Sequence, residues 1–554
     1  MKKIIFSVLL LMSFELFAQD FDSLAHNIAD QLENVTAGKK EYQQTLEVQE
    51  PGVVTVKIEV IDSKGKTKTN DYLFNLADID PNTVRATAKR DVITINVSTN
   101  KKQKLIKKTV NNEKVSYINN FVLYGSDIDN GRAIAKSIKA AIPAAKKILD
   151  KRLSLSGYND RLQWLQDHIG SVDLVKKQIE QNLSLNEQYP GAVVLHKKVA
   201  AGKSEKDYRY SFNLANLNPK RIDFFVSGNT FGLKLETKHG NKLINVVENN
   251  EPKAYTNKIN MACKSVEAAR DIQKVLTDII PLAEQKFKAS LPQISQLSQG
   301  YDVVNPLIEK VTTGSYEYSQ DLSGNCMATL TQNVTGNKKS YEDIYEFNWA
   351  DLNPNQIKPK TKGKYIVIEL KTKGKNKFIK HMRSGELSNY TAGVEIYVPG
   401  AEEAVIIQNI LKKMVNICTK QEETKMKKPL SFSQGFDLLQ NNIKNFNIGD
   451  TSYEQTVSLS DDNKSLKYTN IIAGSKSSKE YLYEVNLADL NPKSIKIKVS
   501  GKKITVEIAS NHMEKLIKYY KDGKIQSYQN KINFYAPGIA TAKNITRALK
   551  AMTK

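Results

Sequence analysis

Several residue types are scarce in this chain, and each scarcity excludes a class of protein. Three cysteines among 554 residues, an odd number, exclude a disulfide-rich scaffold. The 27 glycines and 15 prolines are too few for a fibrous chain, and the 40% hydrophobic share is too high for a fully disordered one. No apolar run reaches the roughly 20 residues that a membrane-spanning helix needs. A folded chain of several domains is therefore expected.

Catalytic patterns are also missing. None of the six histidines belongs to a pair such as His-x-x-x-His or His-Glu-x-x-His. Neither a Gly-x-Ser-x-Gly turn nor a phosphate-binding glycine loop occurs. Only His239 and His512 share a position in the repeats described below, and both lie in a predicted turn. The sequence therefore predicts no catalytic residue, no metal ligand and no cofactor.

The N-terminus has the pattern of a secretory signal peptide. Lys2 and Lys3 precede a short apolar run from Ile4 to Met12, and Ala18 provides a small residue at which cleavage is expected. No cysteine lies near that point, so lipid anchoring is not supported. We expect residues 1–18 to be removed and the protein to be exported. The periplasm is favoured, and the cell surface or the medium stays open.

One sequence pattern occurs four times. Phe74-Asn75-Leu76-Ala77-Asp78 and the following Pro81 have counterparts that end at Pro219, Pro354 and Pro492, which are 138, 135 and 138 residues apart. A period of this length is a whole domain, much longer than the repeats of solenoids. The sequence thus predicts a signal peptide (1–18) and four repeats, at 19–150, 151–290, 291–425 and 426–554.

Each repeat shows the same order of predicted elements. Apolar residues at three- and four-residue spacing predict a leading helix and a closing helix, and alternating β-branched residues between them predict antiparallel strands. The leading helices are expected at 21–35, 158–172, 301–311 and 436–446, and the closing helices at 130–149, 266–287, 401–417 and 539–552. Two or three strands precede the motif proline and four follow it. The charged stretch 420–428 is expected to be a linker.

About six or seven antiparallel strands followed by a C-terminal helix is the element order of a pleckstrin-homology-like (PH-like) barrel. Each repeat resembles that fold in element order, with the leading helix as an addition. The fold class is therefore predicted as α+β, four tandem copies of an antiparallel sheet or barrel. An open sheet with both helices on one face would give the same pattern.

The Asn-x-Ala-Asp/Asn motif has two interpretations. Its carboxylates and amides could line a cation site, but repeat 2 carries no carboxylate there, and a calcium loop needs more anionic oxygens. The favoured interpretation is structural. In it Asn75 ends a strand, Asp78 and Asp80 cap a short turn, and Pro81 ends that turn.

Two other residue types recur in register with the motif. A lysine follows a polar turn in every repeat, and PH-like domains hold phosphate head groups on such turns, so an anion site is one hypothesis and a solvated lysine the other. A tyrosine 36 positions after each proline is expected to pack under the closing helix. The lysines are Lys104, Lys242, Lys377 and Lys515, and the tyrosines are Tyr117, Tyr255, Tyr390 and Tyr528.

The chain is basic, with 82 Lys and Arg against 59 Asp and Glu, and its densest basic segment lies in repeat 3. Residues 358–383 contain ten basic residues and one acid, Glu369. Four of the lysines are spaced by two, so an extended strand would place them on one face. Aromatic residues are not interleaved with them, which does not favour nucleic acid. The predicted anion-binding residues are Lys358, Lys360, Lys362, Lys364, Lys377, Arg383, Lys104, Lys242 and Lys515.

Four repeats without a recurrent active site favour a binding function over catalysis, because weak binding sites gain avidity when they are linked in one chain. The sequence therefore predicts an exported, non-enzymatic, multivalent binding or scaffold protein of the bacterial envelope. Its partner would be an anionic envelope component or another protein. A carrier of lipid or another apolar ligand is the alternative, and a hydrolase is the third hypothesis. Oligomeric state is not predicted.

Overall fold

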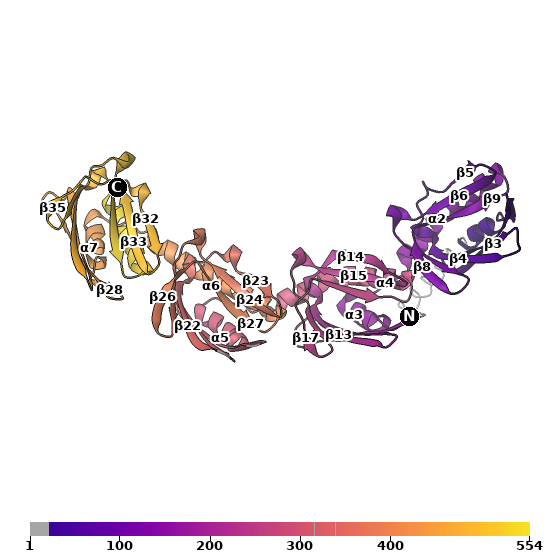
Figure 1. The fold of residues 1–554 in the computed structure, drawn as a ribbon, viewed down its shortest axis with the longest axis horizontal. Helices are drawn as coiled ribbons and strands as arrows, with labels where there is room; N and C mark the ends of the chain where they lie inside the picture. The colour runs from indigo at the N-terminus through magenta and orange to yellow at the C-terminus, as the bar shows by residue number, and fades with distance from the viewer. Residues whose placement is uncertain (1–20, 175, 315, 338, 554) are drawn as a thin grey trace, which may run out of the picture. The chain divides into compact units, whose positions relative to one another are not determined.

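The computed structural model describes residues 21–174, 176–314, 316–337 and 339–553. The predicted signal peptide lies outside these residues. The described chain folds as four similar α+β repeats, each with one six-stranded and one three-stranded antiparallel sheet (Figure 1). Each repeat has nine strands, more than the six or seven predicted. The difference arises because four strands precede the short turn that follows the motif asparagine and five strands come after that turn.

The six-stranded sheets share one strand order. The fourth strand pairs with the seventh, because a hairpin between them leaves for the other sheet. These sheets contain β1 (Val35–Ala37), β2 (Lys40–Glu50), β3 (Val53–Asp62), β4 (Thr67–Asn75), β7 (Ile106–Val110) and β8 (Lys114–Ile118) in repeat 1; β10 (Val172–Leu174), β11 (Lys177–Leu185), β12 (Ala192–Ala201), β13 (Ser204–Asn213), β16 (Asn245–Glu248) and β17 (Glu251–Pro252) in repeat 2; β19 (Lys310–Thr313), β20 (Tyr316–Gly324), β21 (Met327–Gly336), β22 (Ser340–Asn348), β25 (Ile379–Arg383) and β26 (Glu386–Thr391) in repeat 3; and β28 (Phe446–Ile448), β29 (Thr451–Leu459), β30 (Ser465–Gly474), β31 (Ser477–Asn486), β34 (Lys518–Lys521) and β35 (Lys524–Ile525) in repeat 4.

The three-stranded sheets are formed by the hairpin that follows the motif and by the last strand of the repeat. They contain β5 (Arg85–Lys89), β6 (Val92–Ser98) and β9 (Asn120–Gly125); β14 (Leu217–Ser227), β15 (Thr230–Thr237) and β18 (Lys258–Ala262); β23 (Lys358–Lys362), β24 (Tyr365–Lys371) and β27 (Gly393–Val398); and β32 (Lys496–Ser500), β33 (Lys503–Ala509) and β36 (Lys531–Ala536).

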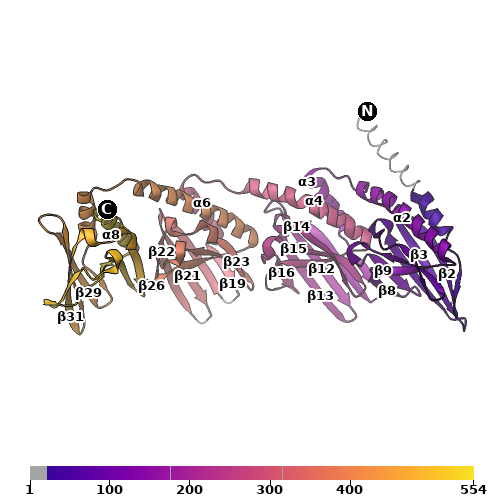
Figure 2. The same cartoon turned by 90° about the horizontal axis from the view of Figure 1, so that it is seen from above.

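The predicted helices are present, with shifted ends. The leading helices are residues 21–29, α3 (Gly157–His168), α5 (Leu297–Ile308) and α7 (Phe432–Asn442). The closing helices are α2 (Ile128–Lys151), α4 (Val266–Ser290), α6 (Ala401–Met426) and α8 (Ile539–Met552). Most of the charged stretch 420–428 therefore belongs to α6 and is not a linker. Figure 2 shows α4 running along β14 and β15.

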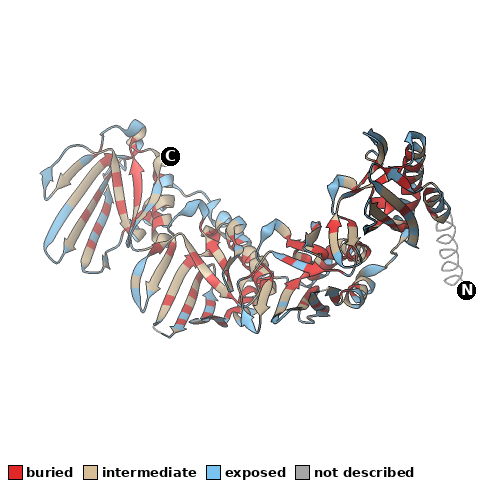
Figure 3. Ribbon diagram, turned by 45° about the vertical axis from the view of Figure 1, so that its right-hand side comes forward, coloured by how far each residue is buried: buried red, intermediate tan, exposed pale blue. Residues whose placement is uncertain are grey.

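Each core lies between the two sheets and includes both helices. In repeat 1 the leading helix contributes Ile28, the six-stranded sheet Val56, the three-stranded sheet Ile95 and the closing helix Ile138, all at most 3% exposed. Burying such a side chain contributes about 1.5–3 kcal/mol relative to exposure. Buried and more exposed positions alternate along the strands (Figure 3) because successive side chains point to opposite faces.

The Asn-x-Ala motif forms a short 3-10 turn at the end of a strand. The Asn75 side-chain oxygen accepts a hydrogen bond from the Ala77 amide at 2.9 Å, and the other three repeats repeat this contact. Asp80 caps the following turn by accepting from the Asn82 amide. The structural interpretation is confirmed for these residues. Asp78 has a different role, because it faces Arg270 of repeat 2 at 2.5 Å.

The described chain divides into two compact units between Ser290 and Leu291, so repeats 1 and 2 form one unit and repeats 3 and 4 the other. Tyr117 of repeat 1 joins the core of repeat 2, with its ring 4.9 Å from that of Phe231. Tyr390 of repeat 3 likewise joins the core of repeat 4. The prediction that these tyrosines pack under their own closing helix is therefore wrong for both. The following repeat covers them, and sequence periodicity does not reveal which repeat provides the cover.

Cys326, just before β21, and Cys418 in α6 form a disulfide, and Cys263 is a buried free thiol. Burial raises the pKa of Cys263 to about 12, so this thiol stays protonated and unreactive at neutral pH.

Candidate functional site

A row of polar side chains crosses the inner face of the six-stranded sheet in repeat 3. Gln320, Gln332, Asp343 and Arg383 occupy directly paired positions on β20, β21, β22 and β25. Paired residues of neighbouring strands project to the same face, so the four side chains form one line. A core-facing row is normally apolar because burying a polar group costs free energy. This row therefore marks a part of the sandwich that is not ordinary core.

The glutamines of the row tie the two sheets together. The Gln320 amide donates to the backbone oxygens of Ile308 at 3.0 Å and Tyr397 at 2.9 Å. Gln332 donates to the Gln320 side chain at 2.9 Å and to the backbone oxygen of Glu395 at 2.8 Å. All donors reach acceptors, so the buried amides are satisfied and hold the last strand of the small sheet against the large one.

This glutamine recurs in all four repeats, although it is not among the residues predicted from the sequence. Gln44 and Gln181 donate to the backbone oxygens of Tyr124 and Ala262, and Gln455 accepts from the Tyr535 amide. The available signal was a glutamine two residues after a tyrosine or isoleucine on the second strand of each repeat. It stands there as Gln44, Gln181, Gln320 and Gln455.

Asp343 is the charged centre of the row. It is 5% exposed and accepts hydrogen bonds from Arg383 at 2.8 and 2.9 Å and from His381 at 2.8 Å. Burial alone would raise the pKa of Asp343, but the hydrogen bonds from Arg383 and His381 outweigh it and hold the pKa below its ordinary value. The carboxylate is therefore ionised at neutral pH and fixes the Arg383 guanidinium.

Tyrosine rings surround these charges. The Arg383 guanidinium lies 4.5 Å from the centre of the Tyr341 ring, and Tyr345 stacks on His381 at 4.6 Å. Tyr318 of the large sheet stacks on Tyr397 of the small sheet at 3.6 Å. Burial raises the pKa of Tyr345 and of Tyr397, so both hydroxyls stay protonated and available as hydrogen-bond donors.

The four tyrosines, Gln332, Asp343 and Arg383 line a cleft of about 660 Å³ between the two sheets, together with Glu369, Lys371, Lys375 and Glu395. Pockets that hold small molecules typically measure about 300–1,000 Å³. Lys375 lies in the turn between β24 and β25 and makes no ion pair with a described residue. The cleft thus combines flat aromatic surfaces, a fixed guanidinium and an uncompensated ammonium group.

The predicted lysine stripe lies beside this cleft. Strand β23 begins at Lys358 and ends at Lys362, and Lys364 lies in the turn after it. The stripe therefore has three lysines on the strand and not four. Lys358 pairs with Glu369 across the sheet, and Glu369 pairs with Glu395. Since paired residues share a face and both glutamates line the cleft, the strand lysines lie on the cleft side of the small sheet.

Half of the basic segment is compensated by carboxylates, most of them distant in sequence. Asp343 binds Arg383, Glu346 binds Lys380 and Glu395 binds Lys362, at 2.5–3.0 Å. Glu369 contacts Lys360 and Lys371. The other five basic residues are exposed and form no ion pair within the described chain: Lys358, Lys364, Lys373, Lys375 and Lys377.

The recurrent lysines do not gather into one site. Lys104, Lys242, Lys377 and Lys515 are exposed, each in its own repeat, immediately after the same turn. That turn contains a left-handed residue, which is Lys101 in repeat 1 and His239 in repeat 2. The shared position of His239 and His512 therefore reflects a backbone turn. Among the nine predicted binding residues, the structure brings Lys358, Lys360, Lys362 and Arg383 to the cleft or its edge.

The polar row differs in composition between repeats. In register with the recurrent glutamine it contains Ile58, Asn70 and Val110 in repeat 1, Lys197, Tyr208 and Glu248 in repeat 2, and Asn470, Tyr481 and Lys521 in repeat 4. Burial lowers the pKa of Lys197 to about 8, and its ammonium donates to the Asn260 backbone oxygen at 2.8 Å. The same position thus carries different chemistry in each repeat.

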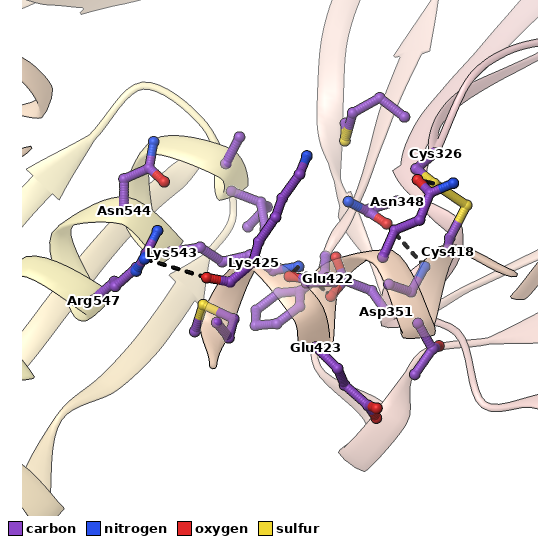
Figure 4. Close-up of a pocket in the computed structure, with 18 of the residues that line it drawn as sticks. Cys326, Asn348, Asp351, Cys418, Glu422, Glu423, Lys425, Lys543, Asn544 and Arg547 are labelled. Carbon is purple, nitrogen blue, oxygen red and sulfur yellow. Dashed lines mark hydrogen bonds and ion pairs between the residues drawn. A yellow bond between two sulfur atoms is a disulfide. The ribbon is translucent and has the colours of Figure 1, made fainter. Parts of the chain in front are cut away.

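A second hollow of about 620 Å³ lies between repeats 3 and 4 (Figure 4). Lys543 of repeat 4 binds Asp351 at 2.5 Å and Glu422 at 3.1 Å, and Arg547 donates to the backbone oxygen of Lys428 at 3.1 Å. These groups satisfy one another across the junction. Their main role is therefore to join the two repeats.

Among residues 21–174, 176–314, 316–337 and 339–553, no group of three or more His, Cys, Asp or Glu side chains could hold a metal ion. No helix in those ranges is both long and apolar enough to cross a membrane. Comparison with known proteins gives no matching family model, curated protein or solved structure.

Proposed function

We propose that this protein is an exported, non-enzymatic binding protein of the bacterial envelope, and that the cleft of repeat 3 holds an anionic envelope component. The observation that carries the proposal is the polar row from Gln320 to Arg383, which places fixed charges and tyrosine rings where a sandwich normally has apolar core. Such groups serve a ligand better than they serve packing.

The chemistry of the cleft favours an acidic saccharide chain. Sugar rings pack their C–H faces on tyrosine, and Tyr341 and Tyr345 provide two such surfaces. Sugar hydroxyls pair with carboxylates and amides, while acidic substituents pair with Lys375 and the Arg383 guanidinium. The uncompensated lysines at the edge, Lys358 among them, attract a polyanion from a distance.

The four repeats place the recurrent glutamine and its row in four sheets of a single chain, with different side chains in each. Linked sites raise overall affinity through effective concentration, which suits a long envelope polymer and gives no advantage to a single catalytic centre.

The proposal is tested on a heparin column with residues 19–554. The variant Lys358→Gln/Lys364→Gln/Lys377→Gln removes exposed charges that form no ion pair in the described chain, so folding is expected to be unaffected. It should elute at clearly lower salt, because fewer counterions are released when the polyanion binds. A matched variant removes three exposed lysines of repeat 1: Lys64, Lys66 and Lys89. Equal elution of the two variants would show that attraction is diffuse and would contradict a site in repeat 3.

A further inference from the structure

The two junctions inside the compact units use the same contacts. The strand pair β7–β8 of repeat 1 inserts Tyr117 against Phe231 of repeat 2, and Tyr390 of repeat 3 enters the core of repeat 4. Both tyrosines are less than 10% exposed. In both junctions the last hairpin of one large sheet therefore presents a tyrosine that packs into the core of the next repeat. This tyrosine is the apolar contact that the two junctions share.

The charged part recurs as well. Asp78 of the repeat 1 motif binds Arg270 of the repeat 2 closing helix, and Asp351 of repeat 3 binds Lys543 of repeat 4. In both cases the partners are 192 residues apart and occupy equivalent positions of their repeats. Each junction thus has a presenting face, with the tyrosine and the aspartate, and a receiving face, with the basic residue.

Repeat 4 has an uncovered presenting face. Tyr528, equivalent to Tyr117 and Tyr390, is 41% exposed, and its neighbours Leu516 and Ile525 are 38% and 60% exposed. Asp489, equivalent to Asp78, forms no ion pair with any residue of the described ranges. These four residues are called the repeat 4 presenting face below. Large apolar side chains exposed side by side are typical of an interaction surface.

Repeat 1 has an uncovered receiving face. Arg132 and Asp129 of α2 form the same i,i+3 pair as Arg270 and Glu267 of α4. The α4 pair is buried at its junction, with side chains 15% and 9% exposed, whereas the α2 pair is 69% and 83% exposed. The arrangement that receives Asp78 in repeat 2 is therefore present in repeat 1, where Arg132 forms an ion pair within the described ranges only with Asp129 of its own helix.

The side chains on the hairpin of the receiving face also differ in size between repeats 1 and 2. Repeat 2 presents Phe224, Val226 and Phe231, and repeat 1 has Ala86, Ala88 and Ile93 at the equivalent positions. Ala88 is exposed and Ile93 is half-buried, while Phe231 is 1% exposed. Small side chains leave room for the bulky residues of the repeat 4 presenting face, so shape and charge complement each other.

We propose that the repeat 4 presenting face docks on repeat 1 of a second copy of this chain, with Asp489 binding Arg132 and Tyr528 packing over Ala86 and Ala88. The contact joins two different surfaces, so each added copy leaves one of each open, and association continues beyond the dimer. The proposal does not depend on the saccharide cleft, but self-association would multiply the number of clefts on a polymer.

The experiment measures the mass of residues 19–554 by sedimentation velocity over roughly a hundredfold range of concentration at low salt. Mass is expected to rise with concentration past the dimer and to fall when salt is added. Arg132→Glu and Tyr528→Ser, both at exposed positions, should each weaken association at least about tenfold. A chain with both Asp489→Arg and Arg132→Asp should associate again, because the charges are exchanged. Lys203→Glu, an exposed charge change in repeat 2, should leave association unchanged.

Three results would overturn the proposal. A single species of monomer mass at every concentration would show that the presenting face does not receive a second copy. A closed dimer that is lost with Tyr528→Ser and unaffected by Arg132→Glu would show that two presenting faces meet each other instead. Failure of the charge-exchanged chain to associate, with its circular dichroism unchanged, would remove the ion pair from the contact.

Discussion

Replacement of Arg270 by leucine tests the junction between repeats 1 and 2. Arg270 is the basic partner of Asp78 at 2.5 Å and contacts Glu267 at 3.4 Å, and all three side chains are at most 15% exposed. Removing one member of a buried ion pair leaves an uncompensated charge, which typically costs about 3–5 kcal/mol. We expect the free energy of unfolding of the unit that contains repeats 1 and 2 to fall by that amount at pH 7.

The pKa of Asp78 predicts how the loss of stability caused by Arg270→Leu depends on pH. Burial raises this pKa from 3.8 to about 6 even though Arg270 lowers it. That rise corresponds to roughly 3 kcal/mol that ionised Asp78 costs the folded state with Arg270 in place, and the loss of Arg270 adds to this cost. A raised acid pKa favours folding at low pH, and the benefit is lost as pH passes about 6. The Arg270→Leu deficit should therefore be largest at pH 7–8 and should shrink towards pH 5.

Urea unfolding followed by tryptophan fluorescence provides the assay. Trp164 and Trp349 are the two tryptophans of the chain and lie in different compact units, so Trp349→Phe leaves Trp164 as the reporter for repeats 1 and 2. Arg132→Leu is the control, measured at a protein concentration low enough to keep the chain monomeric, because Arg132 occupies the equivalent position at 69% exposure and its loss should then change stability by less than about 0.5 kcal/mol.

A double variant distinguishes charge from packing. Repeats 2 and 3 carry Asn216 and Val405 at the positions of Asp78 and Arg270. The double variant Asp78→Asn/Arg270→Val removes the buried charge together with its partner and should recover most of the lost stability. If Arg270→Leu is no more destabilising than Arg132→Leu, or if its deficit does not change between pH 5 and 8, the reasoning on Asp78 is refuted.

Three further predictions concern the sheets, the disulfide and the division of the chain. Gln320→Leu leaves the Tyr397 amide without its acceptor and should lower the stability of repeats 3 and 4 by about 1–3 kcal/mol in a urea assay that keeps Trp349 as the reporter and replaces Trp164 by phenylalanine; a neutral effect would contradict a tie between the sheets. Reducing the Cys326–Cys418 bridge, which spans 92 residues, should lower the stability of that unit by about 2–4 kcal/mol and leave repeats 1 and 2 unchanged, whereas an equal loss in both units would show a non-specific effect. Limited proteolysis followed by mass spectrometry should cut near Ser290 first, because the repeats within each unit share buried residues; a first cut near 151 would show that single repeats separate more easily.

Much of the fold could be predicted because local patterns determine it. The alternation of Ile504 and Val506 predicted a half-buried strand, and the apolar spacing of Ile407 and Ile410 predicted a helix packed on a sheet. The recurrence of the pattern in four repeats supported each prediction, because the same helix or strand had to fit four different sequences. Helix ends were predicted less accurately: α6 continues past the predicted end at 417 to Met426, because its charged last turns are solvated on one side.

The candidate site could be predicted only in part, because its contacts join residues far apart in sequence. The basic segment in repeat 3 was visible in the sequence, but the carboxylates that neutralise it were not. Asp343 lies 40 residues before its partner Arg383. Glu395 lies 33 residues after its partner Lys362. Gln320 was missed because one glutamine in an alternating strand is ordinary on a solvent face. Only the register of the folded sheet places it on the inner face.

Binding of an acidic saccharide in the cleft of repeat 3 can be measured by calorimetric titration of a heparin-derived oligosaccharide into residues 19–554. Tyr341→Ala/Lys375→Gln removes a ring and an ammonium group from the cleft, and Lys68→Gln/Lys102→Gln removes exposed lysines at the equivalent positions of repeat 1. We expect the cleft variant to bind at least about tenfold more weakly than the unmodified protein, a loss of roughly 1.4 kcal/mol, and the repeat 1 variant to bind as before. Equal affinities for all three proteins would contradict binding in this cleft.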